Sequence, residues 1–409
     1  MLRLSELKKQ DIINKVILVR VDLNIPIDDK GNITDTTRLV ETLPTINYLI
    51  ENKGRVVLIT HFGRPTCLYD NEGNVINSKS HRNLGSFIYN LGFENIINEY
   101  KKYKINIKKI NSCIGDDVKE NIDNLSEGNV LLLDNVRYYI GETKNDQEFC
   151  KKLANGIDIF IMDAFGTSHR KHASTYGIKE YVPINVMGFL MEKEIKYLNL
   201  IMNSEETLTM TAIIGGSKVS SKFKVLSSMI KKCNKIIIGG GMANTFLKAT
   251  GVDVGKSLIE NELIEDVKLL MKEAQDNNVE IILPTDMVIA ETFSNDSQYK
   301  IINDNEKCDE WMILDIGPKT IDNIKSKLLE SEIVIWNGPL GVFEMEAFSN
   351  GTREIALFLS ELAEKNKTII AGGGDSIAAI NKYELADKYT HISTGGGAML
   401  EYLEGNIKF

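Results

Sequence analysis

The chain has few of the residues on which disulfide-rich or zinc-binding proteins are built. Its five cysteines are odd in number and scattered, with no Cys-x-x-Cys pair: Cys67, Cys113, Cys150, Cys233 and Cys308. This spacing excludes a regular disulfide framework and a cysteine-based zinc site. It is typical of reduced thiols in a cytosolic protein, so we expect a cytoplasmic location.

The sequence also lacks net positive charge and long hydrophobic runs. It has 48 Lys and Arg against 57 Asp and Glu, whereas a general nucleic-acid binder needs a basic face. No apolar run is long enough to cross a bilayer, and the opening "MLRLSELKKQD" has no apolar core of the kind found in signal peptides. We therefore expect binding to neither nucleic acid nor membrane. With 409 residues the chain should form two or three domains.

What the sequence has in abundance is a short β-branched run followed at once by Gly, Asp, Asn, His or Arg. Most of these runs lack polar alternation, so both of their faces should be buried, as in a parallel sheet covered by helices. Amphipathic stretches such as 37–52 and 221–234 lie between the runs and predict helices. The βαβ alternation predicts an α/β fold. The runs are "VILVR", "VVLIT", "VLLL", "DIFIM", "AIIG", "IIIG", "IILP", "IVIW", "TIIAG" and "HIST".

The segment 182–210 is the best candidate for a boundary between domains. It holds a Pro and a Gly and then a helical pattern of apolar residues, Phe189, Leu190, Ile195, Leu198 and Ile201. We predict a connecting helix between two α/β domains of similar size, residues 1–185 and 186–399. Ligands of open parallel sheets bind beyond the carboxyl ends of the strands, so the residues that follow the runs are the candidate site residues.

In the first half, the ends of the runs are rich in Arg and His. Several guanidinium groups at one sheet edge would form a cradle for a small, multiply charged anion. For any single Arg a surface ion pair is usually the better explanation, but Arg20 and His61 adjoin runs that should be buried. The stretch "DAFGTSHRKHAS" adds four adjacent groups that carry or can carry positive charge, which indicate either an anion site or a solvated loop. The residues are Arg20, Asp22, Asn24, Arg38, His61, Arg64, Arg137, His169, Arg170, Lys171 and His172.

In the second half, the ends of the runs are rich in glycine: "GGSKVSSK", "GGGMAN", "NGPLGVFE", "AGGGDS" and "TGGGAM". Glycine lets the backbone approach a ligand and leaves N–H groups free for phosphate, and a helix that starts there adds its positive end. This half therefore looks like a nucleotide-phosphate site, with Asp375 as the natural metal carboxylate. "GVDVGKS" has one residue too few for a P-loop, and Asn244 stands where a dinucleotide fingerprint has its third glycine.

Taken together and in this order, these motifs resemble those of the phosphoglycerate kinase family over almost the whole chain. The resemblance rests on "RVDLNIP", "THFGRP", "MDAFGTSHRKHAST", "GGSKVSSK", "GGGMANTFL", "WNGPLGVFE", "AGGGDS" and "HISTGGGAMLEYLEG". It implies two Rossmann-like domains and reversible transfer of the acyl phosphate of 1,3-bisphosphoglycerate to ADP, giving 3-phosphoglycerate and ATP, in glycolysis and gluconeogenesis. It also implies a C-terminal tail, 400–409, that returns to the first domain. We also expect a monomer.

The resemblance implies roles for individual residues as well. The triose site would consist of Arg20, Asp22, Asn24, Arg38, His61, Arg64, Arg137 and Arg170. The nucleotide site would consist of Gly215, Gly216, Lys218, Lys222, Gly240, Asn337, Pro339, Glu344, Gly373, Gly374, Asp375 and Ser376, with Mg²⁺ held through Asp375. Arg38, Lys218 and the Gly374 backbone would stabilise the phosphoryl group in transit.

Two serines depart from the pattern of the family, which usually reads Gly-Gly-Ala-Lys-Val-x-Asp-Lys. Ser217 replaces the Ala and Ser221 replaces the Asp. Serine can still cap a helix, so the fold is expected to be kept while the charge near Lys222 changes. Two other classes of function stay open at this point. One is a dehydrogenase built on two α/β domains, but the incomplete dinucleotide fingerprint argues against it. The other is an inactive nucleotide-binding regulator. Such a protein should have lost Lys218, Arg38 or Asp375, and all three are present.

Overall fold

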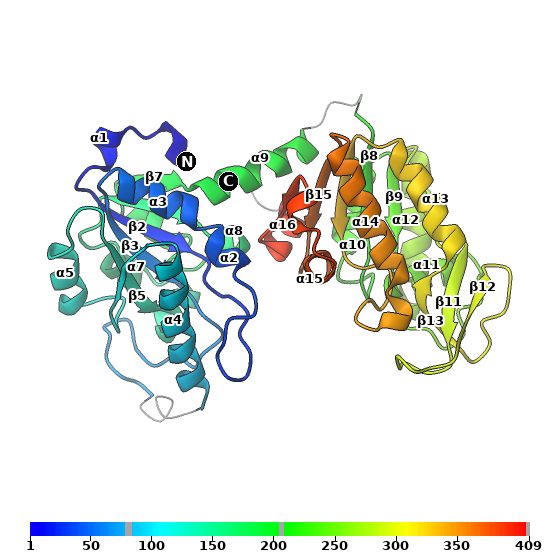
Figure 1. Cartoon of the computed structure of the whole chain (residues 1–409), viewed down its shortest axis with the longest axis horizontal. Helices are drawn as coiled ribbons and strands as arrows, with labels where there is room; N and C mark the ends of the chain where they lie inside the picture. The colour runs from blue at the N-terminus through cyan, green and yellow to red at the C-terminus, as the bar shows by residue number, and fades with distance from the viewer. Residues whose placement is uncertain (78–83, 204–207, 406–409) are drawn as a thin grey trace. The chain divides into compact units, whose positions relative to one another are not determined.

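The computed structural model describes residues 1–77, 84–203 and 208–405, with the side chains of 84–90 left aside. The chain divides into two compact units, the first comprising Met1–Lys196 and the second beginning at Tyr197. Both are α/β units with a parallel sheet covered by helices, as predicted (Figure 1). Of the predicted tail, residues 406–409 lie outside the described part of the chain.

The first unit is built on a seven-stranded sheet with strand order β1-β7-β6-β2-β3-β5-β4, in which neighbouring strands are parallel. Its strands are β1 (Leu2–Arg3), β2 (Val16–Val21), β3 (Arg55–Thr60), β4 (Ile107–Lys109), β5 (Val130–Asn135), β6 (Ile159–Asp163) and β7 (Ile184–Met187). Its helices are α1 (Lys9–Ile12), α2 (Thr37–Val40), α3 (Leu43–Glu51), α4 (Leu84–Lys102), α5 (Asp116–Asp123), α6 (Ile140–Lys144), α7 (Gln147–Leu153) and α8 (Phe165–Ser168).

Successive side chains of the central strands point to opposite faces of this sheet, and both faces are buried. Ile17, Val19 and Val21 of β2 join a core with side chains of α3 and α4, such as Ile46 and Phe93. The residues between them on β2 therefore point to the opposite face. Because every residue of β2 is buried, Arg20 is forced to find polar partners inside the protein.

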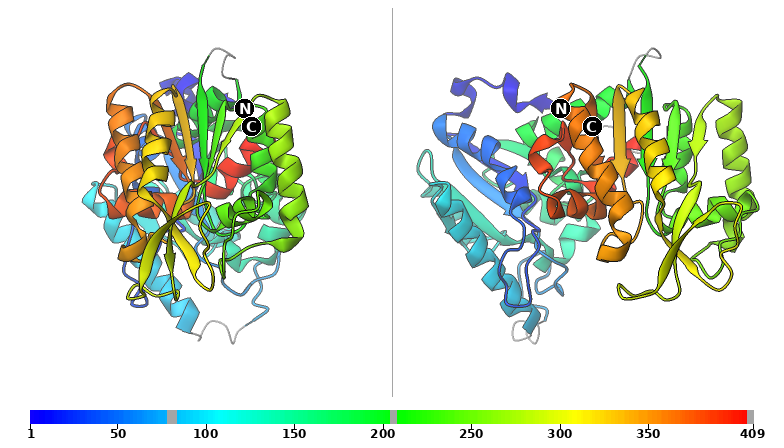
Figure 2. Two further views of the ribbon diagram at one scale, coloured as in Figure 1. Left: turned by 90° about the vertical axis from the view of Figure 1, so that its right-hand side faces the viewer. Right: turned by 45° about the vertical axis from the view of Figure 1, so that its right-hand side comes forward.

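The second unit has a six-stranded parallel sheet with strand order β10-β9-β8-β14-β15-β16. Its strands are β8 (Met210–Ile214), β9 (Lys235–Ile238), β10 (Glu280–Ile282), β14 (Ile333–Asn337), β15 (Thr368–Gly372) and β16 (His391–Ile392). Its helices are α10 (Phe223–Ile230), α11 (Gly241–Ala249), α12 (Ile264–Asp276), α13 (Pro318–Leu329), α14 (Asn350–Glu364), α15 (Gly374–Lys382) and α16 (Gly396–Leu403). Figure 2 (left) shows the sheet between α13 and α14 on one side and α11 and α12 on the other.

A second, antiparallel sheet of three strands in this unit was not predicted. It has the order β12-β11-β13 and consists of β11 (Asp286–Ala290), β12 (Tyr299–Asn303) and β13 (Met312–Ile316). The stretch 299–303 has three exposed residues, so it lacks the continuous apolar character that marked the other strands. This sheet matters for the site, because β13 supplies part of the wall of a pocket.

Each predicted β-branched run is a strand, but two segments differ from the expectation. The helix expected over 37–52 is broken into α2 and α3, with Pro44 near the start of the second, because proline is tolerated in the first turn of a helix and not in its interior. The boundary segment contains β7 before its helix, α9 (Phe189–Met202), which spans the junction of the two units.

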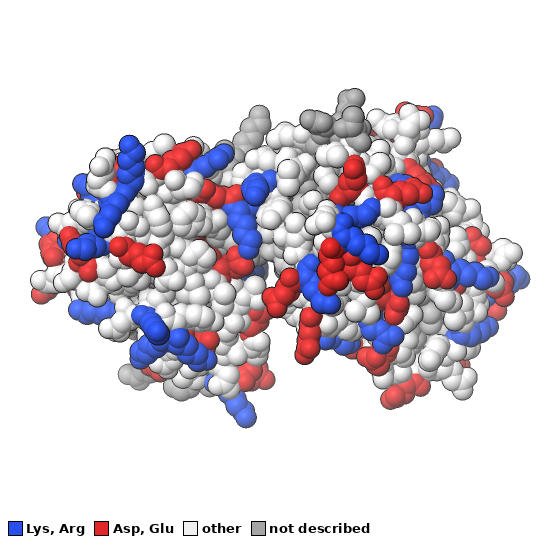
Figure 3. All heavy atoms as spheres, turned by 45° about the horizontal axis from the view of Figure 1, so that its top comes forward, with Lys and Arg blue, Asp and Glu red and all other residues white. Residues whose placement is uncertain are grey.

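On the face drawn in Figure 3, Lys and Arg lie among Asp and Glu, with broad areas of other residues between them. Within the described ranges, no helix combines the length and apolarity that a membrane crossing requires. All five cysteines are free, as predicted.

Candidate active site

Arg20 is a deeply buried charged group at the carboxyl edge of the first sheet, with an exposure of 1%. Its Nε donates to Ser174 Oγ at 2.9 Å, one terminal nitrogen donates to the carbonyl of Val21, and the other lies 3.2 Å from His61 Nδ1. These contacts fix the guanidinium in one orientation. Burial lowers the pKa of Arg20, and the nearby acids Glu142 and Asp22 oppose the effect.

Glu142 is a buried acid that the sequence did not single out. It is fully buried on α6 and accepts from Ser174 Oγ at 2.7 Å and from Ser174 N at 2.9 Å. The chain of hydrogen bonds therefore runs from Arg20 through Ser174 to Glu142. Burial raises the pKa of Glu142, while the positive charge of Arg20 lowers it in part. Glu142 thus acts as a positioning residue for Arg20.

Asp22, Asn24 and Arg38 form a second cluster where the chain leaves β2. Arg38 donates to the Asn24 carbonyl at 2.8 Å and lies 3.4 Å from Asp22 Oδ2. The Asn24 side chain accepts from Gly63 N at 2.7 Å, which ties this loop to the one that follows β3. The contacts hold the Arg38 guanidinium while leaving it partly exposed.

The remaining predicted arginines belong to the same electrostatic cluster. Burial lowers the pKa of His61 far below its usual range, and the fields of Arg20, Arg137, Arg170 and Arg38 lower it further. His61 is therefore neutral at physiological pH, despite its distance of only 3.9 Å from Asp22 Oδ1.

The pKa of Arg137 indicates which other arginines lie near it in this cluster. Burial lowers its pKa, and Arg170, Arg20 and Arg64 contribute to the lowering. Its Nε is buried with no hydrogen-bond partner. Four arginines, Arg20, Arg64, Arg137 and Arg170, thus lie close enough to interact, and Arg38 acts with three of them on His61. An anion would relieve this concentration of positive charge.

The residues 169–172 were predicted to be either part of an anion site or a solvated loop, and the structure places them differently from one another. Arg170 donates from Nε to His169 at 3.4 Å and belongs to the arginine cluster. Lys171 is exposed, with its ammonium 5.7 Å from the centre of the Tyr176 ring. His172 is half-buried, and burial followed by the field of the arginines lowers its pKa to about 4. Lys171 is therefore a solvated side chain, whereas His172 lies in the field of the arginine cluster and His169 contacts Arg170.

In the second unit, glycines let three loops meet at the carboxyl edge of the sheet. A Cβ atom at Gly215 would collide with the carbonyl of Pro339, and one at Gly240 would lie 2.7 Å from the carbonyl of Gly216. Gly240 also has a φ of 66° and immediately precedes α11. The close approach of these backbones leaves no room for side chains.

Lys222 and Asn337 connect the first of these loops to the end of β14. Lys222 Nζ donates to the Gly215 carbonyl at 2.6 Å, to the Asn337 carbonyl at 2.9 Å and to Asn337 Oδ1 at 2.6 Å. Burial lowers the pKa of Lys222 to about 8, and Asp375 raises it in part. Asn337 Nδ2 is buried without a partner. Both groups are donors that lie at the edge of the sheet.

The N-terminus of α15 lies beside them. Gly373, with a φ of 92°, precedes the helix, and the space around a Cβ at Gly374 is open to 4 Å. Ser376 accepts from Gly338 N at 2.6 Å and so fixes the helix to the loop after β14. Asp375 is exposed in the first turn and is not the N-cap. Its charge is therefore not needed for capping.

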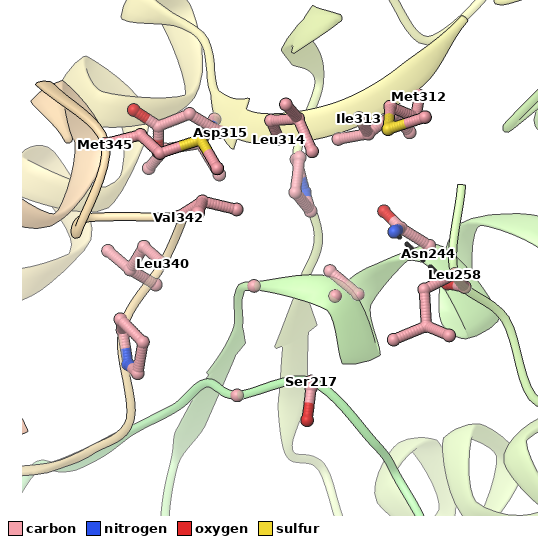
Figure 4. A pocket seen from close by; sticks show the side chains of 18 of the residues that line it. Ser217, Asn244, Leu258, Met312, Ile313, Leu314, Asp315, Leu340, Val342 and Met345 are labelled. Carbon is pink, nitrogen blue, oxygen red and sulfur yellow. Dashed lines mark hydrogen bonds between the residues drawn. The ribbon is translucent and has the colours of Figure 1, made fainter. Parts of the chain in front are cut away.

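A pocket of about 590 Å³ opens between these loops (Figure 4). Of the predicted nucleotide residues it is lined by Gly216, Gly240, Pro339, Glu344 and Asp375. One wall is apolar and was not predicted, since it combines the antiparallel sheet with distant loops. Its members include Leu258, Phe293, Met312, Ile313, Leu314, Val342 and Met345. A pocket with an apolar wall beside glycine turns and a helix N-terminus suits a nucleotide.

Lys218 and the two serines lie on the loop that enters the site. Lys218 and Ser217 are exposed, and Ser217 lines the pocket. Ser221 Oγ donates to the Lys218 carbonyl at 2.8 Å. Neither serine caps α10, whose N-cap is Lys222. The fold is kept, as expected, although it does not use the capping that serine can provide.

Comparison with known proteins agrees with this geometry. A sequence model of the family described as phosphoglycerate kinase matches residues 7–406. The chain belongs to the phosphoglycerate kinase family. It is 46% identical to the phosphoglycerate kinase of Prochlorococcus marinus (strain NATL2A) over 404 residues, with 99% of this chain and 96% of that protein covered. To the phosphoglycerate kinase of Nostoc punctiforme it is 46% identical over 405 residues, again covering 99% and 96%.

The structural comparison leads to the same family. The phosphoglycerate kinase from Coxiella burnetii superimposes with a TM-score of 0.82 at 35% identity, covering 99% of this chain and 96% of that one. The fold, the family and the phosphotransferase activity with a carboxyl group as acceptor are therefore those predicted, and the dehydrogenase alternative falls away.

Proposed function

We propose that the arginine cluster of the first unit binds 3-phosphoglycerate or 1,3-bisphosphoglycerate, and that the glycine loops of the second unit bind ADP or ATP. The observation that carries this assignment is the field of four arginines on the buried, neutral His61. A small anion with phosphate and carboxylate groups matches this concentration of charge, because guanidinium forks bind both groups. Residues 1–185 then form the triose domain and residues 186–399 the nucleotide domain.

The reaction needs no general base, because the attacking carboxylate is already ionised. A carboxylate oxygen of 3-phosphoglycerate forms a bond to the γ-phosphorus of ATP while the bond from that phosphorus to the β–γ bridging oxygen breaks, and ADP leaves. Catalysis then consists of positioning and of charge stabilisation. Arg38, Lys218 and the backbone N–H of Gly374, the first residue of α15, are the groups we assign to the oxygens of the transferred phosphoryl.

Mg²⁺ fits the nucleotide side through Asp375. In the described parts of the chain no group of three or more His, Cys, Asp or Glu could form a closed metal site. Magnesium usually keeps several waters and binds one or two carboxylates together with the phosphates of its nucleotide, so a single exposed carboxylate beside the phosphate loops is sufficient. When bound, the ion would supply charge neutralisation on the nucleotide phosphates.

The two sites lie on different units, so the units have to come together for transfer and water has to be excluded. The predicted return of the tail 400–409 to the first unit stays part of this proposal. We further propose a monomer that acts in the cytoplasm, which the five free and scattered cysteines support.

The assignment of the two sites can be tested by calorimetry on two variants. Arg170→Ala removes one guanidinium group from the arginine cluster. It should weaken binding of 3-phosphoglycerate by about tenfold or more while leaving ADP binding unchanged. Leu258→Glu places a charge on a pocket wall where Leu258 is 52% exposed, and should weaken only ADP binding. The reverse pattern, or equal effects on both ligands, would contradict the assignment.

A further inference from the structure

Asn244 stands out in the nucleotide pocket because its side-chain oxygen has no partner. It lies on α11 with an exposure of 2%, and it is one of the pocket-lining residues. Its Nδ2 donates to the Leu258 carbonyl at 3.3 Å, whereas its Oδ1 is buried without a hydrogen bond. A buried acceptor left unsatisfied is costly, so a donor from outside the protein is expected to complete it.

The orientation of the amide follows from its one hydrogen bond. The Leu258 carbonyl can only accept, so it requires the NH₂ group of Asn244 on its side. The oxygen is then the atom left for a ligand. Figure 4 shows the amide at the margin of the pocket, with the dashed bond to Leu258 on one side and Met312 and Ile313 across from it.

The surroundings favour the base of a nucleotide over its sugar as the missing donor. Met312, Ile313 and Leu258 are apolar, and a purine ring presents apolar faces to such walls while its edge carries the hydrogen-bonding groups. At position 6, adenine carries an amino group that donates, whereas guanine and hypoxanthine carry a carbonyl oxygen that only accepts. A carbonyl oxygen at this position would face the Asn244 oxygen, and two acceptors cannot form a hydrogen bond with each other.

We propose that Asn244 selects the base, its side-chain oxygen accepting a hydrogen bond from the 6-amino group of adenine. The chain then prefers adenine nucleotides over 6-oxopurine nucleotides. This inference rests on the proposed nucleotide site and adds a specificity-determining residue to it.

The test is equilibrium binding of ADP, IDP and purine riboside diphosphate, which lacks any group at position 6. A buried hydrogen bond that is not made typically weakens binding about ten- to one-hundredfold. We expect the wild-type chain to bind ADP tighter than either analogue by such a factor. In Asn244→Leu the preference should fall to within about twofold. Lys248→Met is the matched control, since it changes an exposed residue of the same helix that does not line the pocket, and it should keep the preference of the wild type.

The outcomes separate this inference from the proposal on which it rests. Equal affinity of the wild type for the three nucleotides would overturn the role of Asn244, and this comparison needs no variant. Retention of the wild-type preference by Asn244→Leu would also overturn it. The analogue 2′-deoxy-ADP tests the sugar as the donor: if its loss of affinity disappears in Asn244→Leu, the base is not the partner. A wild type that binds neither ADP nor IDP would instead refute the nucleotide site itself.

Discussion

Lys222 allows a quantitative test of the proposal that the second unit binds an anion at its glycine loops. Its ammonium is surrounded by three carbonyl oxygens at 2.6–2.9 Å, and burial lowers its pKa from 10.5 to about 8. A fall of this size corresponds to about 3 kcal/mol by which the folded protein disfavours the charged form. A bound phosphate would supply the missing negative charge.

The sign of the pH dependence follows from linkage. Between pH 8 and 10.5 Lys222 is protonated in the unfolded chain and largely neutral in the folded one, so the unfolded state binds more protons. The contribution of Lys222 to the free energy of unfolding should therefore rise with pH over this range. It should be absent from Lys222→Met, so that the wild type gains up to about 3 kcal/mol relative to the variant between pH 8 and 10.5.

The assay is urea denaturation followed by tryptophan fluorescence. The two tryptophans, Trp311 and Trp336, both lie in the second unit, so the signal reports on the unit that contains Lys222. Lys224→Met, which removes an exposed lysine of the same helix, is the matched control and should follow the wild type. At pH 8.5, calorimetry should further show that ADP binding takes up a fraction of a proton in the wild type and none in Lys222→Met.

Two results would refute this reasoning. One is a constant difference in stability between the wild type and Lys222→Met from pH 8 to 10.5. The other is proton uptake on ADP binding that is the same in both proteins, because the uptake would then come from a different group.

Three further predictions concern catalysis. Arg38→Ala and Lys218→Ala should each lower turnover by a factor on the order of 10³–10⁵ while weakening substrate binding far less. Steady-state kinetics can measure this. A variant whose turnover stays within a few-fold of the wild type would exclude that residue from the mechanism. Asp375→Asn should leave the melting temperature nearly unchanged, because Asp375 is not the N-cap of α15, yet turnover at limiting Mg²⁺ should fall steeply; near-normal turnover would exclude the metal role. Small-angle scattering should show a smaller radius of gyration with both substrates bound than with either alone, and an unchanged radius would count against closure.

The strands and the charged ends of the strands could be predicted from the sequence. Runs such as "VILVR" are apolar on both faces, and a parallel sheet is the structure that buries both faces. Since the strand ends of such a sheet meet at one edge, the positions of Arg20, His61 and Asp375 at the end of an apolar run, or within three residues after it, were enough to predict that they lie at this edge. Local signals were sufficient because each feature lies within a few residues of its strand.

Features that depend on contacts between distant segments could not be predicted. Glu142 lies within "YIGETK", where nothing distinguishes it from a surface acid, and its role appears only when Ser174 is brought beside it. Asn244 departs visibly from a glycine motif, but its unpaired oxygen depends on the Leu258 carbonyl. The apolar wall from Met312 to Leu314 comes from a sheet whose other edge strand, β12, is largely exposed.

The most direct test of the account is turnover by the purified wild-type chain with 3-phosphoglycerate, ATP and Mg²⁺, in an assay coupled to the consumption of 1,3-bisphosphoglycerate. The account predicts formation of ADP and 1,3-bisphosphoglycerate that requires all three components, and loss of this activity when either Arg38 or Lys218 is replaced by alanine. A folded wild-type chain that forms no 1,3-bisphosphoglycerate, or that releases ADP at the same rate without 3-phosphoglycerate, would contradict it.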